Sequence, residues 1–167
     1  MFRKFAPVLA CSALLVGGCG GDDSSSGGSS SDADAAKPLT KAAYVAQGNE
    51  ICKDTRKAQK PFDDKADDLD RNDLPAAGKL IEEAFDVTRD GFDRLNALSP
   101  PAAEKVRVTE YLTAVDRLLD NREKVIEPLR QGNRAAAIKI TSADDGLDAK
   151  QDRLGDALGL TGCSNVF

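Results

Sequence analysis

Apolar residues between Tyr44 and Leu158 recur every three or four positions, which is the spacing of one face of an α-helix. No segment shows the alternation of apolar and polar residues that is typical of a half-buried strand. Four segments carry such a stripe, so the pattern predicts four amphipathic helices. The stripes are, in chain order, Tyr44, Gly48, Ile51, Cys52, Thr55, Gln59 and Phe62; Ile81, Ala84, Phe85, Thr88, Phe92 and Leu95; Val108, Tyr111, Leu112, Val115, Leu118, Leu119, Val125 and Ile126; and Ala137, Ile140, Leu147, Leu154 and Leu158.

The predicted helices are bounded by residues that favour helix ends. Threonine and serine side chains cap helix N-termini, proline suits a first turn, and glycine suits the position after a helix. The acidic run 63–73 ahead of Pro75 predicts a loop. The other expected boundaries are Thr40 as the first N-cap; Ser99, Pro100 and Pro101, which end the second helix and cap the third; Pro128 and Gln131-Gly132-Asn133 after the third; and Gly159 as the last cap, with Leu160 packing back on Leu154.

Four amphipathic helices joined by short loops predict an all-α fold, a four-helix up-down-up-down bundle over residues 39–167. About 130 residues suit a single domain. The last helix is expected from about Arg134 to Leu158, and Gly146 is a place where it divides in a second interpretation. Small residues on the core-facing stripes, namely Gly48, Ala84 and Ala137, leave room for a cavity between the helices.

The first part of the chain is typical of an export signal. Arg3 and Lys4 precede an uncharged apolar run over residues 5–16, and the segment closes with Val16-Gly17-Gly18-Cys19. Small residues before a cleavage point mark a secretory signal, and a cysteine directly after it is the arrangement of bacterial lipoproteins. The apolar run is shorter than the roughly 20 residues of a membrane-spanning helix. The sequence therefore predicts a lipoprotein signal peptide over residues 1–18 and a lipid on Cys19.

Two other interpretations of this segment stay open. An ordinary secretory signal would place a cysteine at the cut only by chance. Cys11 follows Val8-Leu9-Ala10 and imitates the same motif, although Leu9 is bulky for its position and little apolar sequence precedes it. A diacylglyceryl thioether on Cys19 would hold the protein on the extracytoplasmic face of the cell membrane, because two acyl chains anchor a protein stably.

Residues 19–38 are rich in glycine, serine and aspartate, a composition that cannot bury enough apolar surface to offset chain entropy. The sequence predicts a flexible tether there. The full chain has 23 basic and 28 acidic residues, and loss of Arg3 and Lys4 with the signal leaves a net charge of −7. An acidic domain is a poor partner for nucleic acid, which binds basic surfaces. Aromatic content is 5% without tryptophan, so sugar-stacking surfaces are not expected.

Two cysteines remain in the predicted domain, Cys52 and Cys163. Outside the cytoplasm an even pair in a modest domain favours a disulfide. This bridge would join the end of the chain to the middle of the first helix. A redox-active pair is the alternative, but the spacing is not Cys-x-x-Cys and the chain contains no histidine.

Three short motifs resemble a group of small actinobacterial exported proteins and lipoproteins of unassigned function. They are Tyr44-x4-Asn49-x-Ile51-Cys52, then Leu95-x2-Leu98-x-Pro100-Pro101-Ala102, and finally Gly159-Leu160-x2-Cys163. The resemblance covers nearly the whole predicted domain. It implies a helical bundle with one disulfide and brings no catalytic residue, ligand or cofactor.

Most catalytic chemistry is excluded by composition. Without histidine there is no Ser-His or Cys-His pair and no Glu-x-x-His di-iron set, and no phosphate-binding loop or nucleophile elbow occurs. Asp68-x-Asp70-x-Asn72 begins like a calcium loop, but Asp73 stands where glycine is needed and Lys79 where glutamate is needed. A solvated acidic loop explains it better. Two carboxylate pairs, Glu82-Glu83 and Asp144-Asp145, are typical of exposed helix faces.

These observations predict a membrane-anchored extracytoplasmic lipoprotein with a non-enzymatic binding or structural role in the cell envelope, without metal or cofactor. A small-ligand carrier and a carboxylate-dependent envelope enzyme are the alternatives. A partner in the envelope or wall would be acidic if it used the basic corner between the third and fourth helices, because opposite charge steers association. An ordinary solvated face is the alternative, and it explains that corner better. The basic corner consists of Arg117, Arg122, Lys124, Arg130 and Arg134.

Overall fold

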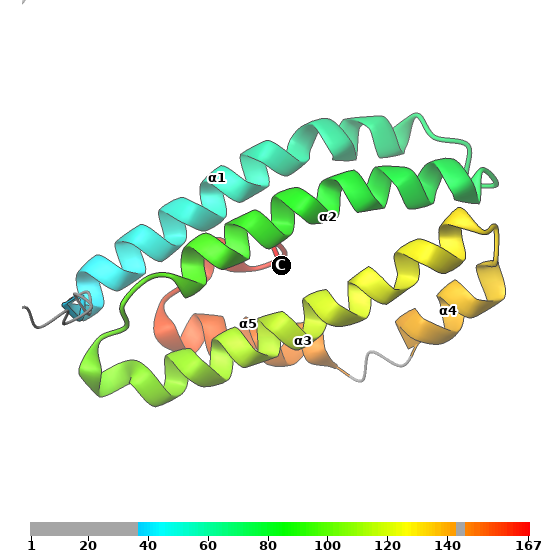
Figure 1. Ribbon diagram of the computed structural model, residues 1–167. Coiled ribbons are helices and arrows are strands. Elements are labelled where there is room, and N and C mark those ends of the chain that lie inside the picture. The colour runs from blue at the N-terminus through cyan, green and yellow to red at the C-terminus, as the bar shows by residue number, and fades with distance from the viewer. Residues whose placement is uncertain (1–36, 143–145) are drawn as a thin grey trace, which may run out of the picture. The chain divides into compact units, whose positions relative to one another are not determined.

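The computed structural model describes residues 37–142 and 146–167, and within them the fold is all-helical (Figure 1). The predicted signal peptide, Cys19 and the Asp144-Asp145 pair lie outside the described residues, as does nearly all of the tether. Two short 3₁₀ turns accompany the α-helices. The elements are α1 (Lys41–Asp67), α2 (Leu74–Asn96), η1 (Ala102–Glu104), α3 (Lys105–Arg130), α4 (Arg134–Ser142), α5 (Leu147–Leu158) and η2 (Thr161–Cys163).

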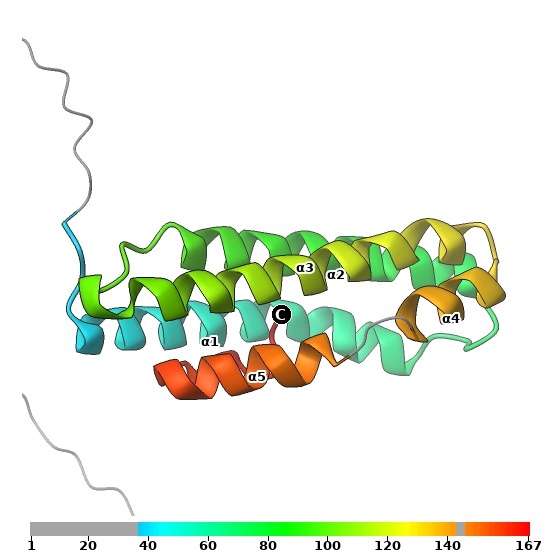
Figure 2. The same cartoon turned by 90° about the horizontal axis from the view of Figure 1, so that it is seen from below.

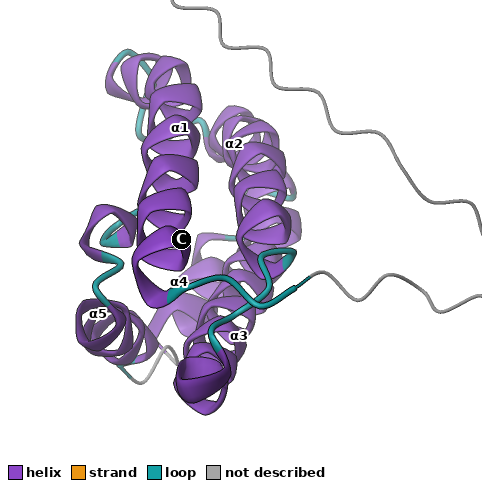
Figure 3. Ribbon diagram, turned by 90° about the vertical axis from the view of Figure 1, so that its left-hand side faces the viewer, coloured by secondary structure: helices purple, strands orange, loops and turns teal. Residues whose placement is uncertain are grey.

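The helices form a bundle in which α1, α2 and α3 pack side by side in the order of the sequence. α1 and α2 make an antiparallel pair, and α3 packs on α2 (Figures 1 and 2). α4 and α5 both pack on α3, one on each half of it. The end-on view shows α5 beside α3, with a short loop leading from α5 to the turn η2 next to α1 (Figure 3). The α5 side of the bundle is therefore closed against α1 by the C-terminal residues.

Two predicted helix caps are confirmed. The Thr40 side chain accepts a hydrogen bond of 3.2 Å from the backbone N–H of Ala43 at the start of α1. Gly159 follows α5 with φ of 86°, a left-handed conformation that favours glycine. The N–H of Leu160 then donates to the carbonyl of Gly155 at 2.9 Å, which closes a Schellman motif and turns the chain back onto the core.

The loop predicted over residues 63–73 is too long, because α1 continues through Pro61 to Asp67. This end of α1 is exposed, so its charges stay in water at little cost. Lys60 pairs with Asp64 one turn on at 2.8 Å, a spacing that supports an exposed helix. Asp73 is the N-cap of α2, and its carboxylate accepts from the N–H of Ala76.

The expected boundaries of the third helix are also corrected. Ser99 does not cap α3; its carbonyl accepts from the N–H of Leu39 at 3.1 Å, and the turn η1 intervenes before α3 begins at Lys105. At the other end α3 runs past Pro128 to Arg130. Pro128 removes one helical hydrogen bond and its ring crowds the carbonyl four residues before it, and only two more residues of helix follow.

The single last helix predicted over 134–158 is wrong, and the second interpretation, a division near Gly146, is confirmed. α4 ends at Ser142, and α5 begins after Gly146, whose φ is 74°. The hydroxyls of Thr141 and Ser142 both donate to the Ile138 carbonyl, at 3.0 and 2.8 Å. Such side-chain bonds compete with the helical ladder, and a left-handed residue cannot continue it.

Most of the predicted apolar stripes meet in one core, which the C-terminal residues Val166 and Phe167 also enter. Ile81 is a correction, because 41% of its surface is exposed although it lies on a predicted core stripe. Gly48 does not leave space for a cavity. A Cβ at this position would lie 2.6 Å from Cδ2 of Leu160, so the glycine makes room for that leucine.

The disulfide prediction is confirmed: Cys52 of α1 and Cys163 of η2 are bonded, with Cα atoms 5.0 Å apart. The segment around Cys163 is also held by side chains of α1. The Arg56 guanidinium donates to the carbonyls of Gly162 and Ser164, at 3.1 and 2.6 Å. The disulfide and these hydrogen bonds therefore hold residues 160–167, which we call the C-terminal wedge, against α1.

Candidate functional site

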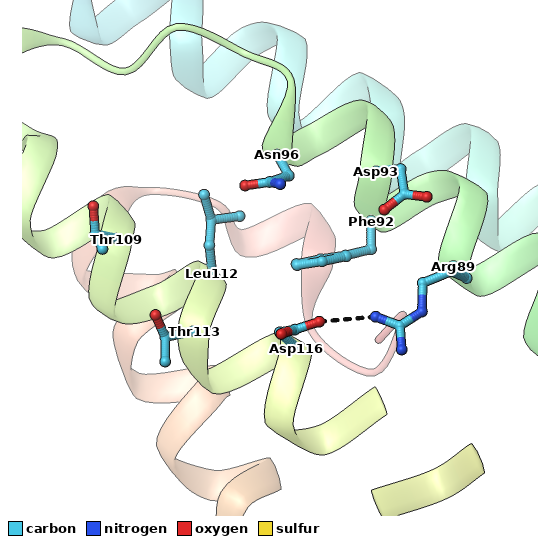
Figure 4. Close-up of a pocket in the computed structure, with 8 residues that line it drawn as sticks. All are labelled: Arg89, Phe92, Asp93, Asn96, Thr109, Leu112, Thr113 and Asp116. Atoms are coloured by element: carbon cyan, nitrogen blue, oxygen red, sulfur yellow. Dashed lines mark hydrogen bonds and ion pairs between the residues drawn. The ribbon is translucent and has the colours of Figure 1, made fainter. Parts of the chain in front are cut away.

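The α2–α3 depression is a hollow on the surface of the described domain that gathers hydrogen-bonding side chains (Figure 4). Its volume is about 370 Å³, near the lower end of roughly 300–1,000 Å³ for small-ligand sites. Each helix contributes four residues at positions i, i+3, i+4 and i+7, which is one helical face. They are Arg89, Phe92, Asp93 and Asn96 from α2, and Thr109, Leu112, Thr113 and Asp116 from α3.

Arg89 is fixed at one end of the depression by ion pairs across the two helices. Its guanidinium donates to Asp116 at 2.8 Å and to Asp120 at 3.1 Å, and Glu123 lies 3.8 Å away. The same group lies over the Phe92 ring, 5.9 Å from the centroid. Burial disfavours its charge, but the hydrogen bonds to Asp120 and Asp116 outweigh burial and raise the pKa of Arg89. Arg89 is therefore a permanent cation.

The chemistry that the depression offers follows from this pairing. Three carboxylates surround the one guanidinium, so little of its positive charge is left for an anionic ligand. Asp93 adds another carboxylate at the rim, and the threonines and Asn96 supply neutral hydrogen-bonding groups. Phe92 and Leu112 face each other across the floor (Figure 4). The depression suits a small ligand group with hydroxyls or a positive charge.

The structure places the basic corner over two separate parts of the surface. Arg117 and Lys124 line one shallow hollow between α3 and the start of α5, together with Leu147. Arg117 and Arg130 are thirteen residues apart on α3, about 20 Å along the helix axis. The five side chains are thus not gathered into one patch.

Several side chains of the basic corner have partners within the domain. Arg122 pairs with Asp148 of α5 at 2.7 Å, and Arg130 pairs with Glu82 of α2 at 3.0 Å. Arg134 donates to the backbone carbonyl of Arg71 at 2.9 Å. These contacts tie α3 to its neighbours and the start of α4 to the α1–α2 loop, which gives part of the basic corner a structural role.

Among the described residues, no group of three or more cysteine, aspartate or glutamate side chains is arranged so that it could hold a metal ion. In the acidic loop, the Asp70 carboxylate accepts from the N–H of Asn72 at 2.9 Å, and Asp73 caps α2. These carboxylates stabilise the turn and the helix start. No helix of the described residues has an apolar stretch long enough to cross a membrane.

Sequence reasoning missed Arg89 and the α2–α3 depression. Phe92 and Leu112 belong to the apolar stripes of α2 and α3, but the six polar residues that line the depression flank these stripes, where polar residues look the same as on any solvated helix face. The one usable signal was the i, i+3, i+4, i+7 spacing of Arg89, Phe92, Asp93 and Asn96, a polar group interrupted by an aromatic residue.

Comparison with known proteins leaves the chain without a match: no protein-family model, curated protein or solved structure is similar to it. The resemblance of its motifs to actinobacterial exported proteins stays a prediction.

Proposed function

We propose that this protein is a lipoprotein anchored through Cys19 to the extracytoplasmic face of the cell membrane, and that it binds its partner without catalysis. The proposal is supported by the lipoprotein motif at Cys19 and by the Cys52–Cys163 bridge, since disulfides persist in oxidising compartments. Its domain is a four-helix up-down-up-down bundle whose fourth helix is the pair α4 and α5. Antiparallel α1, α2 and α3, with α4 and α5 on α3, support this class.

The α2–α3 depression is the binding site in this proposal. The observation that carries it is the neutralisation of Arg89 by Asp116, which also lines the hollow, and by Asp120 and Glu123 outside it. The hollow also presents threonine hydroxyls and an amide. Such a site favours a ligand group with hydroxyls and a positive charge, for example an amino sugar or a basic side chain of a partner. An anion would meet excess negative charge.

A titration with glucosamine, glucose and gluconate tests this site. Asparagine side chains of the purified chain, in detergent, are labelled with nitrogen-15 and observed by NMR. Glucosamine carries hydroxyls and an ammonium group, glucose only hydroxyls, and gluconate a carboxylate. We expect a saturable shift of the Asn96 amide with glucosamine, a weaker one with glucose and none with gluconate.

Asn133 and Asn165 lie away from the depression and serve as internal controls. Asp93→Asn should weaken the response to glucosamine while leaving the response to glucose unchanged. If the Asn96 amide signal shifts with none of the three compounds, or shifts most with gluconate, the α2–α3 depression is not this kind of site.

A further inference from the structure

A second hollow adjoins the α2–α3 depression on the other side of α3. This α3–α5 hollow has a volume of about 380 Å³, close to that of the depression. Thr109 and Thr113 of α3 are exposed and line both hollows, so the two adjoin across this pair of threonines. The α3–α5 hollow is also lined by Glu110 and Arg117 of α3 and by Leu147 and Lys150 of α5.

The two hollows carry opposite charge. In the depression two carboxylates outnumber the guanidinium of Arg89, whereas in the α3–α5 hollow Arg117 and Lys150 outnumber the carboxylate of Glu110. Arg117 and Lys150 are exposed, and neither forms an ion pair with another described residue. Adjoining hollows of opposite charge favour a ligand that carries both charges itself, because complementary potentials select a partner.

The spacing of the two charges follows from the geometry of α3. Asp116 and Arg117 are consecutive in this helix, so their side chains leave its axis about 100° apart, which is roughly 8–9 Å at the helix surface. Alternate side chains of an extended peptide point to the same side and lie about 7 Å apart. The Thr109 hydroxyl donates to the Lys105 carbonyl at 2.9 Å, which leaves its lone pairs free to accept from a peptide N–H.

We propose that the α2–α3 depression and the α3–α5 hollow together bind an extended peptide segment of a partner protein, in which a basic and an acidic residue stand two positions apart. The basic side chain lies in the depression beside Asp93 and Asp116, and the acidic side chain lies beside Arg117 and Lys150. This inference deepens the proposed function and rests on it. An amino sugar would occupy the depression alone, because it has no anionic group for the α3–α5 hollow.

Three peptides with blocked termini test the charge pair and its spacing. They are Ser-Ser-Lys-Ser-Glu-Ser, the same peptide with glutamine in place of glutamate, and Ser-Ser-Lys-Glu-Ser-Ser, in which the two charges point to opposite sides of an extended chain. The asparagine-labelled chain used for glucosamine is titrated with each peptide, and the Asn96 amide shift gives the affinity. We expect the first peptide to bind about two- to fivefold more tightly than the other two, the range of exposed ion pairs.

Arg117→Gln combined with Lys150→Gln should abolish this preference, whereas Lys57→Gln on the exposed face of α1 should retain it. All three side chains are exposed, so the variants are expected to fold. Equal affinities for the three peptides, or a preference that the double variant keeps, would overturn the inference. If glucosamine shifts the Asn96 signal while the peptides bind equally, the α2–α3 depression stands and only its extension fails. If neither glucosamine nor any peptide shifts that signal, both proposals fail.

Discussion

Gly91 sets how closely the first two helices approach. A Cβ there would lie 2.7 Å from Cγ2 and 3.0 Å from Cβ of Thr55, which is itself buried and bonded to the Ile51 carbonyl of α1. Glycine inside a helix normally costs up to about 1 kcal/mol relative to alanine. The protein accepts this cost because the close contact between α1 and α2 leaves no space for a side chain.

We predict that Gly91→Ala lowers the free energy of unfolding by about 1–3 kcal/mol, the usual cost of overpacking, despite the better helix propensity of alanine. Urea denaturation followed by circular dichroism measures it. Thr55→Ala should be less harmful in the Gly91→Ala background than in the wild-type protein, because the clash is partly relieved. A Gly91→Ala protein that is more stable than the wild type would contradict the packing described here.

The two tyrosines make stability depend on alkaline pH. Burial raises the pKa of Tyr44 and Tyr111 to about 12 in the folded chain, whereas an unfolded tyrosine ionises near pH 10. Below pH 10 both states are protonated and the shift has no effect. Above pH 10 the unfolded state loses its protons first, so the free energy of unfolding falls as pH rises towards 12.

We predict that ultraviolet absorbance shows no tyrosine ionisation in the folded protein near pH 10, where the protein in concentrated urea ionises normally. The chain has no tryptophan, so the tyrosines dominate this signal. Tyr44→Phe and Tyr111→Phe should each remove half of the absorbance change. Ionisation of the folded protein near pH 10 would show that the phenols are in contact with solvent.

At the scale of elements, the C-terminal wedge replaces part of the contact that a long fourth helix would make with α1. Phe167 is 1% exposed and meets the Phe92 ring edge to face, with centroids 6.2 Å apart. The Gln59 amide donates to the Val166 carbonyl at 2.9 Å. The disulfide connects positions 111 residues apart and holds this wedge on α1.

Loss of this bridge should destabilise the domain. Closing a loop of this length stabilises a chain by about 4–5 kcal/mol in the entropy model, so Cys52→Ala with Cys163→Ala should lower Tm by about 10–20 °C. Thermal unfolding by circular dichroism measures the shift, and Cys19→Ser is the control with unchanged Tm. An unchanged Tm in the double variant would show that hydrogen bonds and packing alone hold the wedge.

The sequence predicted those elements whose signals are local. Thr40 and Gly159 mark helix ends by their own side chains or lack of one, and the stripes identify the core faces. The predicted disulfide placed Cys163 against the first helix, but the burial of Val166 and Phe167 was missed because two residues are too few to show a period. The first helix was predicted to end too early because the acidic residues 63–67 were taken as part of a loop. Charges are harmless on a helix face that is exposed to water.

The candidate site could not be predicted because it depends on which two helices are neighbours and at what register. Arg89 and Asp116 are ordinary charged residues until α2 and α3 bring them to 2.8 Å. For the basic corner, nearness in sequence was misleading, because it does not show whether a charge has a partner on another helix. Its residues are near in sequence, but Arg122 and Arg130 are paired with Asp148 and Glu82 from other helices.

At the scale of the whole molecule, the proposed function divides the protein into a lipid anchor and a binding domain. Because an acidic domain is repelled by anionic lipid, membrane attachment in the proposed function would depend on a lipid at Cys19. We predict that Cys19→Ser moves the protein out of the membrane fraction or leaves it unprocessed, as fractionation and immunoblotting would show. Fatty-acid labelling that persists in this variant would place the lipid elsewhere, with Cys11 the first position to examine.

Photocrosslinking in intact cells tests most directly whether the α2–α3 depression binds a partner. A photoreactive residue replaces exposed Thr113 in the α2–α3 depression or, as a control, exposed Lys57 on α1. We expect a discrete adduct from position 113 that weakens with Asp93→Asn, and none from position 57. Equal adducts from both positions would contradict the assignment of the depression as the binding site. So would an adduct from position 113 whose yield is unchanged in the Asp93→Asn variant.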